Sequence, residues 1–257
     1  MIENPVRRKL LAGETCFGTM AFELFSPGLP AILAAGGAEY VVIDTEHSGA
    51  GIDVVKTQIA LCRAAGIVPI VRVPGLARHL ICPVLDAGAL GIMVPMVETA
   101  AQAALLVSFC RYRPAGTRGL AFGLAHDHYR PGLPRMSMDA ANEAVLVIPM
   151  IETVAGLENA REIMAIEGVD LGWLGHFDLT DSMGIVGEFE NRRYRAAEAR
   201  LLAIGRELGK PFGWLAANGA QARAAAGRGF ACLCLSTDVA LLRGAMAREI
   251  NAARGNS

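Results

Sequence analysis

The sequence predicts an α/β protein that folds as a (β/α)8 TIM barrel, in which eight parallel strands alternate with eight helices. Its 257 residues are close to the roughly 250 that such a barrel needs. Short apolar runs alternate with helix-like stretches along the whole chain. Ionisable side chains follow several of these runs, and strand ends are where a barrel carries its functional groups. We therefore expect a single barrel domain over residues 1–257.

The expected strands are short apolar runs, in the order Cys16–Met20, Tyr40–Asp44, Pro69–Val73, Gly91–Val94, Val145–Met150, Leu171–Leu174, Phe212–Leu215 and Cys232–Leu235. Most of them are separated by helix-like segments, in the order Leu29–Ala35, Asp53–Ala64, Ala77–Leu85, Ala100–Phe109, Leu157–Ile166, Arg192–Leu208, Ala220–Ala226 and Val239–Ala252. Glycine follows several segments, as expected at helix C-termini: Gly66, Gly88, Gly168, Gly209 and Gly229. This order favours a parallel barrel. The alternative, an open doubly wound sheet, normally carries a G-x-G-x-x-G loop after its first strand, and this sequence lacks one there.

One long loop, residues 111–143, breaks the alternation, because connections in such folds usually have about 2–6 residues. A loop of this length inside a compact domain is usually functional or mobile. We weigh two interpretations equally, a lid over the site and a contact between subunits. Within the loop, His126 and His128 have a spacing more typical of solvated surface than of metal ligands.

The composition argues against several classes of partner. The net charge is −1, 19% of residues are charged and no basic stripe is visible, so we expect no nucleic acid partner. No apolar run reaches the roughly 18 residues of a membrane span, and no signal-type apolar core follows the first residues. The cysteines form no C-x-x-C pair and read as small buried apolar residues in a reducing compartment. We expect a cytoplasmic protein without a membrane partner.

Three ionisable residues end the second expected strand, where the buried run Tyr40–Ile43 leads into Asp44, Glu46 and His47. Burying such groups unpaired is costly, so they must meet water, a metal ion or a ligand. His47 is suited to act as a general base near neutral pH. The alternative is a structural histidine bonded to backbone, but its neighbours at a strand end favour function.

Two further acids follow later strands, Glu152 and Asp178. A pair of carboxylates leaves coordination positions open for water and substrate, which suits Mg²⁺ or Mn²⁺. The alternative is that each acid caps the helix after it, although Thr153 and Thr180 could serve as caps instead.

Two more charged residues are candidates for the site. Arg72 lies inside an apolar run and must pair with an anion, either a protein carboxylate or a substrate carboxylate. Asp86 ends a helix-like segment, so only the fold could bring it to the site. The stretch Gly175–Thr180 reads as a loop entering a helix, where free N–H groups favour a carboxylate or phosphate.

Taken together, these segments resemble the HpcH/HpaI family of class II, metal-dependent pyruvate aldolases over nearly the whole chain. The matching segments are Phe17-Gly-Thr-Met20, Val42-Ile-Asp-Thr-Glu-His47, Val71-Arg-Val-Pro74, Leu85-Asp-Ala-Gly88, Val94-Pro-Met-Val97, Arg111-Tyr-Arg-Pro-Ala-Gly-Thr-Arg-Gly119, Ile151-Glu-Thr153, Asp178-Leu-Thr180, Ala216-Ala-Asn218 and Asp238 before Leu241-Leu242. None is decisive by itself, but the set is specific.

The resemblance implies a barrel of the phosphoenolpyruvate/pyruvate type, whose swapped C-terminal helix packs on a neighbouring subunit. It also implies a homo-oligomer, commonly a hexamer built as a trimer of dimers. Glu152 and Asp178 match the ligands of a divalent ion, Mg²⁺, Mn²⁺ or Co²⁺. Arg72 matches the arginine that binds pyruvate, His47 and Asp86 match a base dyad acting through ordered water, and Asp44 matches an acid near the metal-bound waters. Gly175, Phe177 and Asp178 lie in the turn expected to bind the substrate carboxylate.

The implied reaction is the reversible aldol cleavage of a 4-hydroxy-2-oxo acid to pyruvate and an aldehyde through a pyruvate enolate. The three lysines, Lys9, Lys56 and Lys210, are not at strand ends, which argues against the lysine-dependent class of aldolases. Two alternatives remain. One is a citrate-lyase-like enzyme acting on oxaloacetate or a CoA thioester, and the other is a noncatalytic barrel that binds 2-oxo acids.

The sequence departs from the family pattern at four positions, which bear on the choice of aldehyde. His176 and Phe177 stand where many relatives have a proline and a variable residue, Met150 where a glutamine is common, and Met20 where a tryptophan is common. The sequence leaves the physiological aldehyde, preferred metal, stereochemistry and pathway open, but the added bulk suggests a less polar or aromatic aldehyde.

Overall fold

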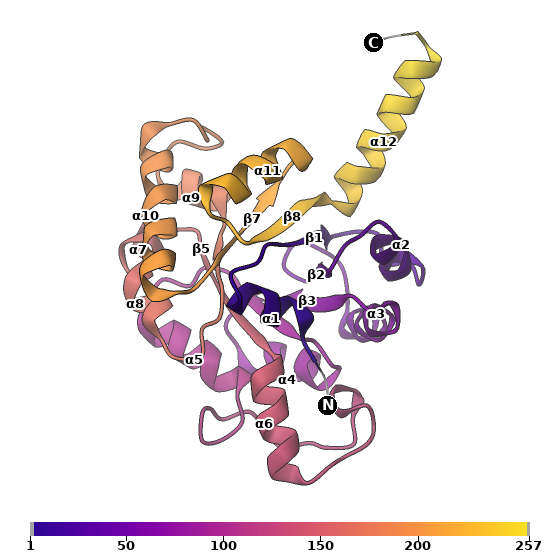
Figure 1. The fold of residues 1–257 in the computed structure, drawn as a ribbon, viewed down its shortest axis with the longest axis vertical. Coiled ribbons are helices and arrows are strands. Elements are labelled where there is room, and N and C mark those ends of the chain that lie inside the picture. The colour runs from indigo at the N-terminus through magenta and orange to yellow at the C-terminus, as the bar shows by residue number, and fades with distance from the viewer. Residues whose placement is uncertain (1–2, 256–257) are drawn as a thin grey trace.

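Eight parallel strands close into a barrel in a computed structural model, which describes residues 3–255 (Figure 1). The strands follow one another in sequence order around the barrel, and β8 pairs with β1 to close it. Their bounds are β1 Cys16–Ala21, β2 Tyr40–Asp44, β3 Val68–Arg72, β4 Gly91–Val94, β5 Leu146–Ile151, β6 Gly172–Leu174, β7 Phe212–Ala216 and β8 Cys232–Thr237. The predicted barrel is confirmed, with strand bounds within two residues of the expected ones.

Side chains alternate along each strand between the barrel interior and the layer under the helices. In β2, Val42 belongs to the inner cluster with Met93 and Ile148, whereas Val41 and Ile43 pack against the helices. All of these side chains are buried. A strand that is buried on both faces has a continuous apolar sequence rather than an alternating one. The apolar runs of the sequence therefore predict these strands.

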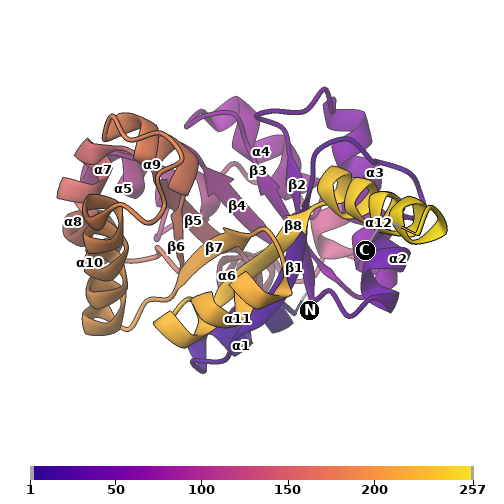
Figure 2. The same ribbon diagram turned by 90° about the horizontal axis from the view of Figure 1, so that it is seen from above.

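Most of the helices that cover the barrel are those expected from the sequence (Figure 2). Their bounds are α2 Leu29–Ala35, α3 Ile52–Ala65, α4 Arg78–Asp86, α5 Ala100–Cys110, α10 Arg192–Leu208, α11 Gly219–Arg228 and α12 Asp238–Ala253. The left-handed backbone of Gly66 and Gly209 ends α3 and α10, as predicted. The predicted helix Leu157–Ile166 is instead two helices, α7 Val154–Glu158 and α8 Ala160–Ala165, separated by Asn159, whose side chain donates to the Glu98 carbonyl.

Three helices were not predicted as such: α1 Pro5–Leu11, α6 Pro134–Ala144 and α9 His176–Ser182. The first carries a start signal, because Asn4 accepts a hydrogen bond from the Arg7 N–H and Pro5 follows directly. The Asn4 amide also donates to the Leu90 and Ala144 carbonyls, which fastens α1 across the amino-terminal end of the barrel. Short helices with little apolar periodicity are hard to recognise before their packing is known.

The connection 111–143 lies at the amino-terminal end of the barrel, because it joins the end of α5 to the start of β5. It is not a structureless loop, since it contains a 3₁₀ turn at Ala125–Asp127 (η1) and most of α6. The lid interpretation is therefore wrong within one chain, because the strand ends that carry Asp44 and Glu152 lie at the other end. The interpretation as a subunit contact stays open.

Helix α12 projects away from the barrel (Figure 1). Only Asp238 of its residues is buried, and it anchors the start of the helix by accepting hydrogen bonds from the Phe22, Glu23 and Leu24 N–H groups. The remainder of α12 is exposed or half-buried, and the exposed residues include Leu242 and Met246.

Two smaller expectations concern cysteines and membrane spans. All six cysteines lie within the described residues and are free thiols; five are buried as expected, whereas Cys82 is half-buried. Among residues 3–255, none of the helices has the length and apolar character that crossing a membrane requires.

Candidate active site

The turn after β2 is organised by Asp44, which is fully buried. One of its carboxylate oxygens accepts the His47 N–H at 2.8 Å, and the other accepts the Glu46 N–H at 3.4 Å and the Arg72 Nε–H at 2.5 Å. Asp44 thus fixes the backbone that presents Glu46 and His47. Its carboxylate also forms an ion pair with Arg72 of the neighbouring strand. Residues 44 and 72 lie side by side in the β2–β3 register, so the fold itself brings this pair together.

Arg72 is buried at the end of β3 and is held by two carboxylates. Besides Asp44, Glu46 lies 3.2 Å from its Nη1, and the Phe22 ring lies 5.5 Å from the centre of the guanidinium. The interpretation that Arg72 pairs with protein carboxylates is therefore confirmed. Within the described residues its Nη2 has no protein hydrogen-bond partner, so that edge can still bind a ligand oxygen.

His47 lies beside this pair with a largely exposed side chain. Its Nε2 is 3.7 Å from the Glu46 carboxylate, which in turn contacts Arg72. Burial raises the pKa of Glu46 above its usual value, against the opposing effect of Arg72. The sequence leaves the role of Glu46 open between orienting its neighbours and pairing across a subunit contact, and in the structure Glu46 links the arginine to the histidine.

Glu152 follows β5 and is almost fully buried. One carboxylate oxygen accepts the Met96 N–H at 2.7 Å, from the turn after β4. Burial, with a smaller contribution from the negative charges of Asp178 and Glu46, raises the pKa of Glu152 to about 7. Three carboxylates from three strand ends therefore influence one another at one end of the barrel.

Asp178 lies in the first turn of α9 and is exposed. Asp178 does not cap α9, because the N-cap position of this helix is Gly175 and no side chain of residues 3–255 makes a capping hydrogen bond there. Glu152 is not a cap either, because the Thr153 hydroxyl accepts the Gly156 N–H and begins α7. The capping interpretation of these two acids is wrong.

The donors of this site are hard oxygen atoms that repel one another when ionised, which suits a hard divalent cation. Within residues 3–255, no three His, Cys, Asp or Glu side chains are grouped so as to hold a metal ion by themselves. A site built on Glu152 and Asp178 would therefore take its remaining ligands from water and substrate. The residues present fit such an ion on donor chemistry and on the raised pKa of Glu152.

Gly175 provides the space that Glu152 occupies. A β-carbon at position 175 would lie 2.2 Å from the free carboxylate oxygen of Glu152 and 2.6 Å from its β-carbon. We expect Gly175→Ala to displace this carboxylate and to weaken divalent-ion binding at least about tenfold, measured by calorimetric titration with Mn²⁺. Gly227→Ala is the control, because a β-carbon there meets nothing within 4 Å. Unchanged affinity in Gly175→Ala would show that Glu152 does not hold the ion.

Phe177 extends an aromatic cluster next to Asp178 and is 57% exposed. Its ring lies 5.0 Å from the Phe189 ring and 4.8 Å from the His176 ring, which in turn is 5.3 Å from the Trp214 ring. Burial lowers the pKa of His176 to about 4, so its imidazole is neutral at pH 7. A cavity of about 450 Å³ lies against this cluster, between α9, α10 and α11.

Asp86 does not reach this site within one chain. It ends α4, and in a barrel the helices end at the opposite side from the strand ends. There its carboxylate is bound by Arg118 Nη2 at 2.8 Å. The expected dyad of His47 and Asp86 is thus not formed inside a single protomer, because the sequence match carries no information on which end of the barrel a residue occupies.

The site is thus an arginine, a histidine and several carboxylates gathered at the strand ends of a closed barrel. The model of the HpcH/HpaI aldolase/citrate lyase family matches residues 20–245. The chain belongs to this family.

Its relatives cover almost the full chain. It is 34% identical over 253 residues to the hydroxypyruvate/pyruvate aldolase of Chromohalobacter salexigens, and the match covers 98% of each chain. The crystal structure of an HpcH/HpaI aldolase from Desulfitobacterium hafniense superimposes with a TM-score of 0.93 at 27% identity, over 98% of this chain and 97% of that one. The citrate synthase SbnG superimposes with a TM-score of 0.83 at 29% identity, over 97% and 95% of the two chains.

These comparisons identify the protein as an enzyme of the aldolase type, a class of carbon–carbon lyases. The roles of individual residues remain predictions, because likeness over the whole chain does not test any one side chain.

Proposed function

We propose that this enzyme is a class II pyruvate aldolase, which reversibly cleaves a 4-hydroxy-2-oxo acid to pyruvate and an aldehyde. The observation that carries the proposal is the arrangement around Arg72, whose guanidinium is fixed by Asp44 and Glu46 while its Nη2 has no hydrogen-bond partner among residues 3–255. A 2-oxo acid presents two oxygens that such an edge can bind.

Glu152 and Asp178 are the residues that would hold a divalent cation, Mg²⁺, Mn²⁺ or Co²⁺. Such an ion supplies positive charge that favours negative charge on the keto oxygen of a bound 2-oxo acid. Glu152 is kept in place by the Met96 N–H and by the space at Gly175. Asp178 lies in the first turn of α9, and its charge contributes to the raised pKa of Glu152.

Arg72 and His47 divide the remaining tasks. The positive charge of Arg72 binds and orients the substrate oxygens and stabilises the enolate of pyruvate. His47 accepts the proton that leaves the methyl carbon, and its exposed ring can exchange that proton with water. The enolate carbon then bonds to the carbonyl carbon of an aldehyde, and the aldehyde oxygen takes a proton from water to become the 4-hydroxyl group; the reverse sequence gives the cleavage. Asp44 positions both residues through the backbone and the ion pair.

The aromatic cluster supports an aldehyde of low polarity. Phe177 stands next to Asp178 and leads to the cavity lined by Phe189 and Trp214. Neutral His176 adds no charge that would attract a second carboxylate. We expect cleavage of aryl or aliphatic 4-hydroxy-2-oxo acids to be faster than cleavage of dicarboxylic ones, and a preference for the dicarboxylic substrates would contradict this.

A condensing or citrate-lyase-like reaction is the second candidate, favoured by the likeness to the citrate synthase SbnG. Both reactions can begin with an enolate, so Arg72 and His47 serve either one. Assays with oxaloacetate and with 4-hydroxy-2-oxo acids, run on the same preparation, decide between them.

The decisive experiment is exchange of the pyruvate methyl protons in D₂O, followed by NMR with and without Mg²⁺, Mn²⁺ or Co²⁺. We expect exchange that depends on the ion and that is strongly reduced in His47→Ala. Exchange no faster than the background would refute the pyruvate enolate. Undiminished exchange in His47→Ala would remove His47 from the role of base.

We also propose that the enzyme assembles as a homo-oligomer, for which the family resemblance implies a hexamer, through α12. Val239, Leu242, Met246 and Ile250 recur at spacings of three and four residues on this projecting helix, and each is exposed. A stripe of this kind in solvent marks an interaction surface. We expect Leu242→Asp with Met246→Asp to reduce the mass measured by light scattering, with Arg243→Asp as the control. An unchanged mass would exclude α12 from the contact.

A further inference from the structure

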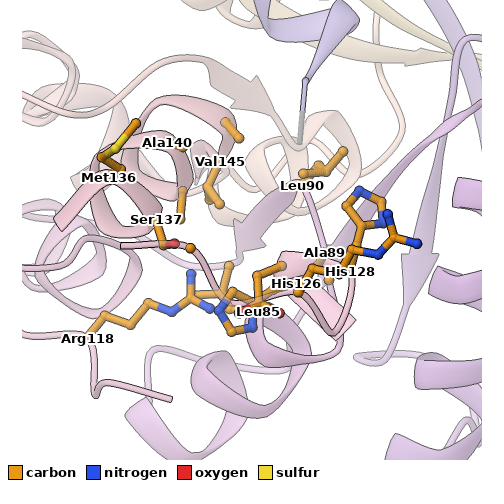
Figure 3. Close-up of a pocket in the computed structure, with 16 residues that line it drawn as sticks. Leu85, Ala89, Leu90, Arg118, His126, His128, Met136, Ser137, Ala140 and Val145 are labelled. Atoms are coloured by element: carbon orange, nitrogen blue, oxygen red, sulfur yellow. The ribbon is translucent and has the colours of Figure 1, made fainter. Parts of the chain in front are cut away.

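A second polar site lies at the amino-terminal end of the barrel, away from the strand ends that carry the aldolase residues. A partly open cavity of about 230 Å³ lies there between the end of α4, the start of β4, the connection 118–132 and α6 (Figure 3). Two residues of its wall stand directly before strands, Leu90 before β4 and Val145 before β5. The cavity therefore lies at the amino-terminal end of the barrel.

Arg118 is the first reason to regard this cavity as a binding site. The residue is 5% exposed and lines the cavity. Its Nη2 donates to Asp86 at 2.8 Å, and its guanidinium stacks over the Tyr112 ring at 4.6 Å, so its orientation is fixed. Its Nε is buried and has no partner among the described residues. A buried donor of this kind is costly unless an acceptor reaches it.

His126 is the second reason, because it stands beside Arg118 and is 8% exposed. Its Nδ1 is also buried and has no partner within residues 3–255. Burial lowers the pKa of His126, and the charge of Arg118 lowers it further, so the ring is neutral at pH 7. A neutral imidazole has one donor and one acceptor nitrogen, and can therefore accept a hydrogen bond from a hydroxyl group.

Asp127 completes the polar part of the wall. One carboxylate oxygen accepts the Gly123 N–H at 2.6 Å, and the other is buried and has no partner in the part of the chain that the structure describes. Three buried polar atoms without partners thus belong to neighbouring residues of one cavity. Arg118 offers a donor, whereas Asp127 offers an acceptor, so a ligand that satisfies both must carry an acceptor and a donor group.

The rest of the wall limits the size and charge of such a ligand. It is formed by apolar side chains, among them Leu85, Leu90, Met136, Ala140 and Val145. The cavity is slightly smaller than the roughly 300 Å³ at which ordinary ligand pockets begin. The lining carries Arg118 and Arg130 against Asp127, with Asp86 behind Arg118. Asp127 and Asp86 already balance the charges of the two arginines. A ligand with more than one negative charge would therefore lack positive charge to pair with.

We propose that this cavity binds a small hydroxy monocarboxylate with a short apolar chain, at a site separate from the aldolase site. The carboxylate accepts from Arg118 Nε, the hydroxyl donates to His126 or Asp127, and the chain lies against Leu90 and Met136. The proposal does not depend on the reaction proposed above, since none of these residues serves it.

The test uses 2-hydroxy-3-methylbutanoate as the probe in calorimetric titrations of the full protein with EDTA. We expect binding that weakens at least about tenfold when the probe loses its hydroxyl (3-methylbutanoate), its charge (the amide) or its apolar chain (2-hydroxypropanoate). Ala141→Phe, which fills the cavity from α6, and His126→Phe should each weaken binding by a similar factor. Arg135→Phe on the exposed side of α6 is the matched control.

Arg72→Lys separates this site from the aldolase site and should leave the titration unchanged within about twofold. Binding lost in Arg72→Lys but kept in Ala141→Phe would overturn the proposal, because the probe would then occupy the aldolase site. No binding by the wild-type protein would overturn it as well. A reduced oligomer mass in Ala141→Phe, with no effect on the titration, would mean that a second copy covers the cavity. His126→Phe keeps the proposal testable if Ala141→Phe does not fold.

Discussion

Glu152→Gln should stabilise the metal-free protein above pH 7 and at the same time abolish its stabilisation by Mn²⁺. Burial first, and then Asp178 and Glu46, raise the pKa of Glu152 from 4.5 to about 7, so the folded state holds this proton more tightly than the unfolded state. Ionised Glu152 therefore lowers the stability as the pH rises from about 4.5 to about 7. At about 1.4 kcal/mol per pKa unit, the cost above pH 7 reaches about 3 kcal/mol. A neutral glutamine removes this cost and still accepts the Met96 N–H.

Glu152→Gln also removes a charged ligand of the ion. In the presence of Mn²⁺ the variant should therefore lack the stabilisation that the wild type gains. A ligand at a hundred times its Kd stabilises a folded protein by about 2.7 kcal/mol. Melting curves at pH 5 and pH 8, with EDTA or Mn²⁺, measure both effects. Glu158→Gln is the control, because this glutamate is exposed. If Mn²⁺ still raises the melting temperature of Glu152→Gln as much as that of the wild type, Glu152 is not a ligand.

Arg72→Met should abolish pyruvate proton exchange and also destabilise the fold. Exchange should fall on the order of 10²-fold or more, as expected when a positive charge aimed at a developing oxyanion is removed. Asp44 would keep its bonds to the Glu46 and His47 N–H groups but lose its cation while remaining fully buried. Breaking a buried ion pair at one partner costs about 3–5 kcal/mol.

The two effects separate in a double variant. Asp44→Asn removes the unpaired charge, and its amide oxygen can still accept the His47 N–H, so Arg72→Met with Asp44→Asn should recover most of the stability. Proton exchange should not recover, because no guanidinium is present. Denaturant titration and NMR exchange on the same preparations measure the two quantities. Recovery of exchange in the double variant would mean that Arg72 acts only through the fold.

Much of the fold could be predicted from local pattern. The run Tyr40–Ile43 is continuous and apolar because a barrel strand is buried on both faces, and the strand Tyr40–Asp44 has the bounds that were predicted. The helix Arg192–Leu208 carries its own amphipathic repeat and a stop at Gly209, and its bounds are also those expected. Helix α6 escaped recognition because it has few apolar residues and covers only the amino-terminal end of the barrel.

The candidate site was only partly predictable for a different reason. Strand ends could be located, so Asp44, His47, Arg72 and Glu152 could be expected at one end of the barrel. Which atoms meet there depends on the register between strands far apart in sequence. The contacts of Arg72 with Glu46 and of Glu152 with the Met96 N–H therefore had no signal in the sequence.

The sequence by itself determined that this chain is a barrel whose strands end in acids, an arginine and a histidine, because strand burial and residue chemistry are local properties. Only the tertiary structure decided that Gly175 makes room for Glu152. The reason is that the end of β6 must lie so close to the end of β5 that a β-carbon at position 175 would collide with the Glu152 carboxylate. It also placed Asp86 with Arg118 at the opposite end from His47, because a helix that follows a strand must run back before the next parallel strand begins.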